Sequence, residues 1–195
     1  IPAVSRNAGY DASAFAAVAK VMDSYQVLVV SPDLPVRSVA ELIAYAKANP
    51  GKLNFSAAGV GNITHLSGEL LKSRAGIDAV PVQFKSGAES LASILAGQAH
   101  FSIDNVTAVR ALVNEKRLRA LAVTATARRA EFPDLPTMIE AGLPDFVITA
   151  FFGIVAPAAT PRPVIQKLNA VINEALKSEA MIESLKRLGA QPSPE

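Results

Sequence analysis

The sequence predicts an α/β protein whose core is a mostly parallel sheet covered by helices. Short apolar runs alternate along the chain with amphipathic segments of about ten to fifteen residues, a length typical of connecting helices. The hydrophobic content is 50%, which in 195 residues is enough for one domain or two modest ones.

The first strand is expected at 26–30, where QVLVV is continuously apolar and Ser31-Pro32 stops it. A run without polar alternation is typical of a buried parallel strand. A helix follows: Ser38 can cap it, Glu41 completes a capping box three residues later, and Asn49-Pro50-Gly51 ends it.

The alternation continues to about residue 124. Strands are expected at 53–56, 80–84, 100–104 and 118–124. The helices between them are expected to end near Ser73, to cover 90–95, and to cover 105–117.

The pattern changes after Thr124. Prolines at 133, 136 and 144 predict a stiff, irregular connection with one short helix, and the apolar stretch VITAFFGIVAP follows it. Helices are expected to complete the chain. Thr160 would cap the first of them, Pro161 would lie in its first turn, and its apolar face would consist of Ile165, Leu168, Val171, Ile172 and Leu176.

Composition excludes several classes of function. The net charge is only +2 and the basic residues are scattered, so we expect no nucleic-acid partner. Without cysteine there is no disulfide, thiol nucleophile or cysteine metal site. No apolar run approaches the length of a membrane span, so we expect the chain not to be embedded in a membrane. No signal peptide, cofactor motif or metal motif is present in the sequence.

The segment NFSAAGVGNITHLSGELLK is the most informative local pattern. A short strand leads into a loop of small residues from Ser56 to Asn62, and an amphipathic helix follows. The loop lacks the third glycine of a dinucleotide fingerprint and the GK[ST] of a Walker motif. Two interpretations remain: a glycine turn that only reverses the chain, or a nest of backbone N–H groups that binds an anion at the helix N-terminus.

Polar or small residues follow three of the expected strands, at Ser56–Asn62, Lys85–Ala88 and Asp104–Asn105. Ligands of α/β sheets bind beyond the carboxyl ends of strands, so these segments could form one site. Asp104 could cap the next helix or accept a hydrogen bond from a ligand, and Lys85 could be solvated or attract an anion.

Catalytic chemistry has weaker support. His65 and His100 are interpreted as structural, because neither has an evident partner. Ser56 and Ser86 lack a nearby base, and no HExxH, GxSxG or EF-hand pattern occurs. We therefore expect no catalytic residue and no metal ligand.

Four segments together resemble the Bug/TctC family, the periplasmic solute receptors of tripartite tricarboxylate transporters. They are SAAGVGNITHLSGELLK, VPVQFKSGAESLASILAGQ, KRLRALAVTATARRAEFPDLPTMIEAGLP and FFGIVAPAATPRPVIQKLNAVINEAL. The resemblance spans nearly the whole chain in the same order. It implies a type II periplasmic-binding-protein fold with two lobes and a hinge, and a receptor rather than an enzyme.

The resemblance also implies the site. By position, the family's ligand loop corresponds to Ser56–Glu69, its second turn to Phe84–Ser90, and its acidic strand end to Asp104. The residues expected to bind the ligand are Ser56, Ala57, Ala58, Gly59, Gly61, Asn62, Thr64, Phe84, Lys85, Ser86 and Asp104. The chain departs from the family pattern at Asn62 (usually Ser or Thr), Phe84 (Tyr), Ser86 (often Gly) and Glu89 (often Pro).

The opening loops of family members have no counterpart here, so the resemblance implies a chain truncated at its amino end. Residues 24–147 would form a complete second lobe, and 1–23 with 148–195 the remnant of an incomplete first lobe. The implied protein is periplasmic. It would bind a di- or tricarboxylate, an amino acid or an aromatic acid between its lobes and deliver it to the membrane subunits of the transporter, without a cofactor. The alternative is an α/β enzyme for an anionic metabolite with His65 or Asp104 as acid–base; a ligand-sensing role also stays open.

Overall fold

The computed structural model describes residues 9–193, so the first eight residues of the expected lobe remnant lie outside the described residues. The chain forms two compact units. We call Tyr25–Thr149 the contiguous unit, and Ile1–Ser24 with Ala150–Glu195 the split unit. The chain passes between the units twice, at Ser24–Tyr25 and at Thr149–Ala150.

The sheet of the contiguous unit has the strand order β3-β2-β4-β1-β5. Its strands are β2 (Leu53–Ala57), β3 (Ala79–Gln83), β4 (Phe101–Asn105), β5 (Arg119–Val123) and the last part of β1 (Phe15–Val30). Strand β2 runs parallel to β3 and β4, whereas β1 runs antiparallel to β4 and β5. All strands of this sheet except β1 therefore point the same way.

The expectation that 26–30 is a parallel strand is wrong. It is the central strand of the sheet and antiparallel to both of its neighbours. The continuous apolar run indicates that both faces of the strand are buried, but it does not indicate the direction of the strand, because any strand covered on both sides lacks polar alternation.

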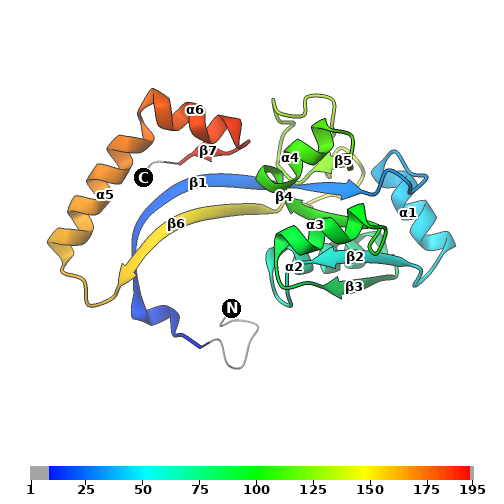
Figure 1. Cartoon of the computed structure of the whole chain (residues 1–195), viewed down its shortest axis with the longest axis horizontal. Helices are drawn as coiled ribbons and strands as arrows, with labels where there is room; N and C mark the ends of the chain where they lie inside the picture. The colour runs from blue at the N-terminus through cyan, green and yellow to red at the C-terminus, as the bar shows by residue number, and fades with distance from the viewer. Residues whose placement is uncertain (1–8, 194–195) are drawn as a thin grey trace. The chain divides into compact units, whose positions relative to one another are not determined.

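Helices cover both faces of this sheet (Figure 1). Helices α1 (Val39–Ala48) and α2 (Ile63–Ala75) contribute to one apolar cluster with Leu28, Phe55 and Phe101. Helices α3 (Gly87–Leu95) and α4 (Val106–Asn114) contribute to a second cluster, with Val27 and Val29. Alternate residues of β1 thus face opposite clusters, as the period of a strand requires.

Capping residues position these helices. Ser38 accepts a hydrogen bond from the Glu41 N–H at 3.1 Å, and the Glu41 carboxylate accepts one from the Arg37 N–H at 2.7 Å. The expected cap of α1 is therefore correct. Helix α2 extends to Ala75, two residues beyond the expected end, and stops at Gly76, whose φ of 60° is left-handed.

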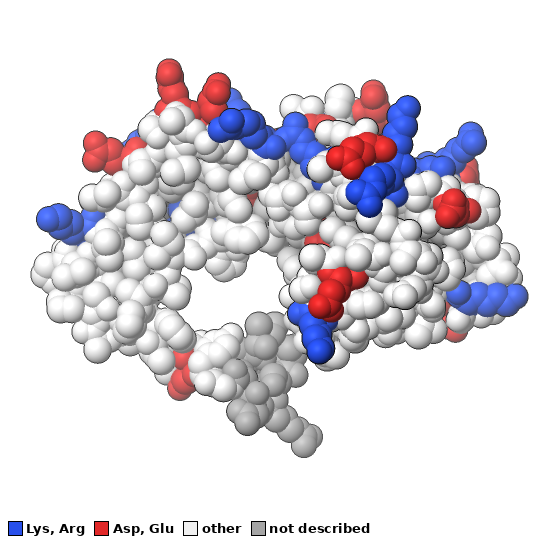
Figure 2. Space-filling model, in the orientation of Figure 1, with Lys and Arg blue, Asp and Glu red and all other residues white. Residues whose placement is uncertain are grey.

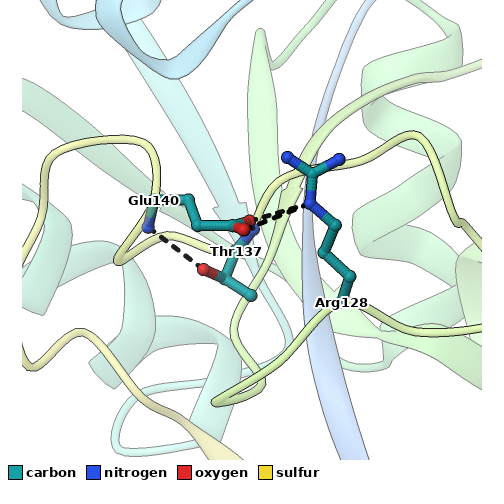
Figure 3. Close-up of polar contacts among 3 residues, drawn as sticks. All are labelled: Arg128, Thr137 and Glu140. Atoms are coloured by element: carbon teal, nitrogen blue, oxygen red, sulfur yellow. Dashed lines mark hydrogen bonds and ion pairs between the residues drawn. The ribbon is translucent and has the colours of Figure 1, made fainter.

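The connection after β5 contains turns and no helix, so the short helix expected there is wrong. Thr137 and Glu140 form a reciprocal pair: the Glu140 N–H donates to Thr137 Oγ1 at 3.1 Å and the Thr137 N–H donates to the Glu140 carboxylate at 2.8 Å (Figure 3). Arg128 Nε donates to the same carboxylate at 3.0 Å. This capping-box chemistry closes a turn instead of a helix because Pro144 follows shortly.

The split unit contains a short 3₁₀ turn (Ala12–Ala14), the first part of β1, β6 (Thr149–Pro157), α5 (Arg162–Leu176), α6 (Glu179–Arg187) and β7 (Gln191–Pro192). Strands β6 and β7 pair with β1. The expected cap at Thr160 is wrong: Pro161 is the N-cap of α5, without a side-chain hydrogen bond, and Pro163 lies in the first turn.

The core of the split unit is small. Its cluster of buried apolar residues comprises Leu176, Leu185 and Ala190. By contrast, Leu168 and Val171 of the expected α5 face are about half exposed, and Phe151 of β6 is 72% exposed. Figure 2 shows that the strands of this unit carry few charged side chains on the face drawn. The exposed surface of β6 is thus largely apolar.

Candidate functional site

The strands β2, β3, β4 and β5 end at one edge of the sheet, which we call the carboxyl edge, because they all run opposite to β1. Helices α2, α3 and α4 each begin just after one of these strands. Three helix N-termini therefore lie at the carboxyl edge, and their N–H groups and dipoles favour an anion there.

The loop after β2 is largely closed on itself. The Ala58 N–H donates to Thr64 Oγ1 at 2.9 Å, and the Asn62 N–H donates to the Gly59 carbonyl at 3.1 Å. Asn62 is the N-cap of α2, since its side-chain oxygen accepts the Thr64 N–H at 3.2 Å. Gly59 and Gly61 have φ values of 101° and 76°, which L side chains rarely adopt. The loop therefore contains the expected glycine turn, and the anion-binding nest stays a prediction.

Three N–H groups in this loop region have no partner among the described residues: those of Gly59, Val60 and Ile63. Val60 is 75% exposed, so this part of the loop faces solvent. Donors that are fixed in place and unpaired suit a carboxylate, because they require no reorganisation when it arrives.

The turn after β3 lies against this loop. The Phe84 N–H donates to the Ala57 carbonyl at 2.8 Å. Ser86 is the N-cap of α3 and accepts the Glu89 N–H at 3.2 Å, while the Glu89 carboxylate accepts the Lys85 N–H at 3.1 Å. Glu89, which departs from the family pattern, thus serves as the second half of a capping box.

Asp104 is 5% exposed at the end of β4. Its Oδ1 accepts the Asn105 N–H at 2.7 Å, and its Oδ2 is buried without a partner among the described residues. Burial raises the pKa of this carboxyl above its ordinary value, and the hydrogen bond from Asn105 opposes that shift. Asp104 does not cap α4: Asn105 does so, accepting the Thr107 N–H at 3.0 Å.

The two histidines have structural partners. His65 Nδ1 accepts the Gly61 N–H at 3.2 Å, and its ring stacks on Phe55 with centroids 6.4 Å apart. His100 Nδ1 accepts the Asn54 N–H at 2.9 Å. His65 lies on α2 on one face of the sheet, while the alternation of β4 directs Asp104 to the opposite face. His65 and Asp104 therefore do not form an acid–base pair in the described part of the chain.

Unpaired polar atoms gather at the carboxyl edge. Six buried side-chain atoms lack a hydrogen-bond partner in the described part of the chain, and five of them belong to residues at this edge: Gln26, Ser56, Ser90 and Asp104.

Sequence reasoning missed Gln26, Ser90 and the buried Thr124. The available signal at Gln26 was a polar residue at the head of an apolar run; Ser90 and Thr124 offered none.

Between residues 9 and 193, no group of three or more His, Asp or Glu side chains is close enough to hold a metal ion. No helix within the same range is long and apolar enough to cross a membrane.

A protein-family model for the TctC receptors, described as "Tripartite tricarboxylate transporter family receptor", matches residues 1–194. This match confirms the resemblance inferred from the sequence. Among curated proteins, the chain is 40% identical over 164 residues to the UPF0065 protein in the tcbD-tcbE intergenic region of Pseudomonas sp. (strain P51), covering 84% of this chain and 49% of that protein. It is 37% identical over 175 residues to protein BugT of Bordetella pertussis, covering 90% and 54%. The chain thus spans about half the length of these relatives.

The chain is also similar to solved structures. Rpa4515 of R. palustris with adipate superposes with a TM-score of 0.94 at 35% identity, covering 98% of this chain and 64% of that one. The periplasmic binding protein BugD gives 0.91 at 30% identity, covering 98% and 64%. MatC of Rhodopseudomonas palustris with bound malate gives 0.88 at 29% identity, covering 96% and 64%. These likenesses confirm the expected α/β periplasmic-binding-protein fold.

Proposed function

The chain belongs to the family of tripartite tricarboxylate transporter receptors, and from that premise we propose that it is part of a periplasmic receptor for a small carboxylate. The ligand would be a di- or tricarboxylate, an amino acid or an aromatic acid. The receptor would deliver it to the membrane subunits of the transporter. Membership of a receptor family agrees with the expectation that the chain is not an enzyme.

The observation that carries this proposal is the set of donors at the carboxyl edge. The N-termini of α2, α3 and α4 lie there, and the N–H groups of Gly59, Val60 and Ile63 have no partner within residues 9–193. Hydrogen bonds to a charged carboxylate contribute about 1.5–3 kcal/mol each, so two or three of them together with closure of the receptor would support binding at micromolar concentrations, which requires about 8 kcal/mol. Relatives that bind adipate and malate support the same ligand class.

Not all expected site residues would contribute in the same way. Ser56 and Ala57 are fully buried, and the side chains of Asn62, Thr64 and Ser86 are engaged within the loops. We propose that these residues shape the loops, while backbone N–H groups and Lys85 meet the ligand. Lys85 is exposed beside α3 and would attract an anion.

We also propose that the contiguous unit is the complete second lobe and the split unit a portion of the first. Two apolar clusters support the first statement. The small core of the split unit and its exposed apolar strand β6 support the second, since an apolar strand in a finished lobe is normally covered.

The test is thermal unfolding of the full-length protein that carries these residues, with adipate, malate, citrate, amino acids and aromatic acids. A ligand held at one hundred times its dissociation constant should add about 2.7 kcal/mol to the free energy of unfolding. A folded protein whose melting temperature no carboxylate raises would contradict the proposal.

A matched pair of variants locates the site. Ser86 and Ser38 are both N-caps followed by a Glu that closes a capping box. Ser38 lies near the opposite edge of the sheet. It follows Val36 by two residues, and the Val36 carbonyl accepts a hydrogen bond from Arg119 at the start of β5. Aspartate caps helices as well as serine does. Ser86→Asp places a negative charge at the proposed site and should weaken carboxylate binding about tenfold, whereas Ser38→Asp should not. Equal affinities in the two variants would place the ligand elsewhere.

A further inference from the structure

Both connections between the units pass one buried threonine. The chain enters the contiguous unit at Tyr25 and leaves it at Thr149. Gln26 and Ile148, each one residue inside these limits, both hydrogen-bond to Thr124, which is fully buried just after β5. Positions where a chain passes between units are where relative motion would be absorbed.

Thr124 bonds to each connection through backbone and side chain together. Toward the first, its N–H donates to the Gln26 carbonyl at 2.9 Å and its Oγ1 accepts the Gln26 N–H at 2.9 Å. Toward the second, its carbonyl accepts the Ile148 N–H at 3.1 Å and its Oγ1 donates to the Ile148 carbonyl at 2.6 Å. The hydroxyl has one proton. The Gln26 carbonyl lies 3.2 Å away, so the shorter contact with Ile148 takes that proton.

Thr124 is itself fixed by its neighbours. The Val123 N–H donates to the Pro136 carbonyl and the Met138 N–H to the Val123 carbonyl, both at 2.9 Å. Val123 also pairs with Val27 in the β1–β5 ladder. The Oγ1 atom is therefore a fixed point between the two connections and not a flexible contact.

Thr124 is also connected to the carboxyl edge. Gln26 pairs with Asn105, the N-cap of α4, and Thr124 directly follows the end of β5. A displacement of either connection would thus act on groups at the edge that we propose binds the carboxylate.

The geometry points to Thr124 as a positioning residue of carboxylate binding: its hydroxyl holds both connections in fixed register with the carboxyl edge, and this prolongs the ligand-bound state. The inference rests on the proposed function. Thr124 does not touch the ligand, and it acts through Gln26 and Ile148.

The test compares Thr124→Val, which has the same shape without the hydroxyl, with Thr124→Ser, which keeps it, in the full-length protein. Malate and adipate serve as probes. In Thr124→Val we expect the dissociation rate constant to rise about tenfold and amide exchange at Gln26 to accelerate at least tenfold, because the Gln26 N–H loses its acceptor. Thr124→Ser should stay within about twofold of the parent in both. Parent-like dissociation rates in Thr124→Val would overturn the inference.

Loss of stability alone must be separated from loss of positioning. Leu42→Ala removes a buried side chain of α1, away from the carboxyl edge, and should lower the melting temperature without changing the dissociation rate. If it accelerates dissociation as much as Thr124→Val does, Thr124 has no specific role. Thr124→Cys, with a weaker donor of similar size, gives an intermediate rate if Thr124→Val does not fold. If the parent protein binds neither these acids nor any other carboxylate, the proposed function fails, whereas parent binding with unaffected variants refutes only the role of Thr124.

Discussion

Asp104 is a buried carboxyl group at the carboxyl edge, at the end of β4. Its carboxyl is 5% exposed, one oxygen accepts the Asn105 N–H, and the other has no partner among the described residues. Burial without a counter-charge disfavours the ionised form, so the pKa is raised. The ionised form of Asp104 therefore lowers the free energy of unfolding relative to the protonated form.

The sign of the pH dependence follows from that shift. Because its pKa is raised, the folded state binds more protons at Asp104 than the unfolded state between the ordinary pKa of 3.8 and the raised value. The free energy of unfolding should fall as pH rises through this window. Urea unfolding at a series of pH values should show the parent losing stability relative to Asp104→Asn as pH rises. A constant difference between the two would contradict the shift.

Glu140 provides an internal control with the opposite sign. The Thr137 N–H lowers the pKa of its carboxyl, so its contribution to stability is present above its ordinary pKa of 4.5 and is lost as pH falls through the lowered value. As pH rises, the parent should therefore gain free energy of unfolding relative to Glu140→Gln, whereas it should lose free energy of unfolding relative to Asp104→Asn.

At the scale of elements, the contact of α2 with β2 depends on Gly68. Phe55 is buried in β2, and its ring lies against Gly68, where a Cβ atom would overlap the ring carbons. The Phe55 ring also contacts those of His65 and Phe101. The position of α2, and with it the loop that begins the helix, therefore depends on a residue without a side chain.

Two glycine substitutions test this contact. Gly68→Ala should lower the free energy of unfolding by about 1–3 kcal/mol through overpacking, although alanine favours helices. In Gly87→Ala, at the start of α3, the added Cβ meets nothing within 4 Å, so stability should change by less than about 0.5 kcal/mol. Chemical denaturation measures both, and equal effects would show that Phe55 does not restrict the spacing.

Local sequence patterns predicted several of the helices, strands and caps. The capping box at Ser38–Glu41 and the element order through β5 were predictable because their chemistry lies within a few residues. The same rules failed at Thr137–Glu140, where a capping pair closes a turn, and at Thr160, where Pro161 begins the helix. In both places a nearby proline competed with the local signal.

At the scale of the whole molecule, the two units differ in their cores. The contiguous unit buries two apolar clusters, one on each face of its sheet. The split unit buries one cluster around Leu176, Leu185 and Ala190, and leaves Phe151 and Val155 largely exposed. Apolar burial is the main favourable term in folding, so the units should differ in stability.

Native-state hydrogen exchange on the 195-residue chain should resolve this difference. Amides of α5 and α6 should exchange at lower free energies of opening than those of β4 and of β1 within 25–30. Slow exchange at one common free energy in both units would mean that the small core is sufficient and that the exposed apolar strand is not a deficiency.

The sequence alone determined the class of the fold, the element order through β5 and the family, because periodicity, caps and motif order depend on residues within short segments. It also indicated the loops that meet at the carboxyl edge. Only the tertiary structure decided that 26–30 is antiparallel, that Asn105 and not Asp104 caps α4, and that Thr124 joins Gln26 to Ile148. The strand direction and the contacts of Thr124 depend on groups from distant parts of the chain, and the cap depends on which of two adjacent side chains accepts the Thr107 N–H. A run of apolar residues or a single threonine looks the same in the sequence whichever partner it has in the fold.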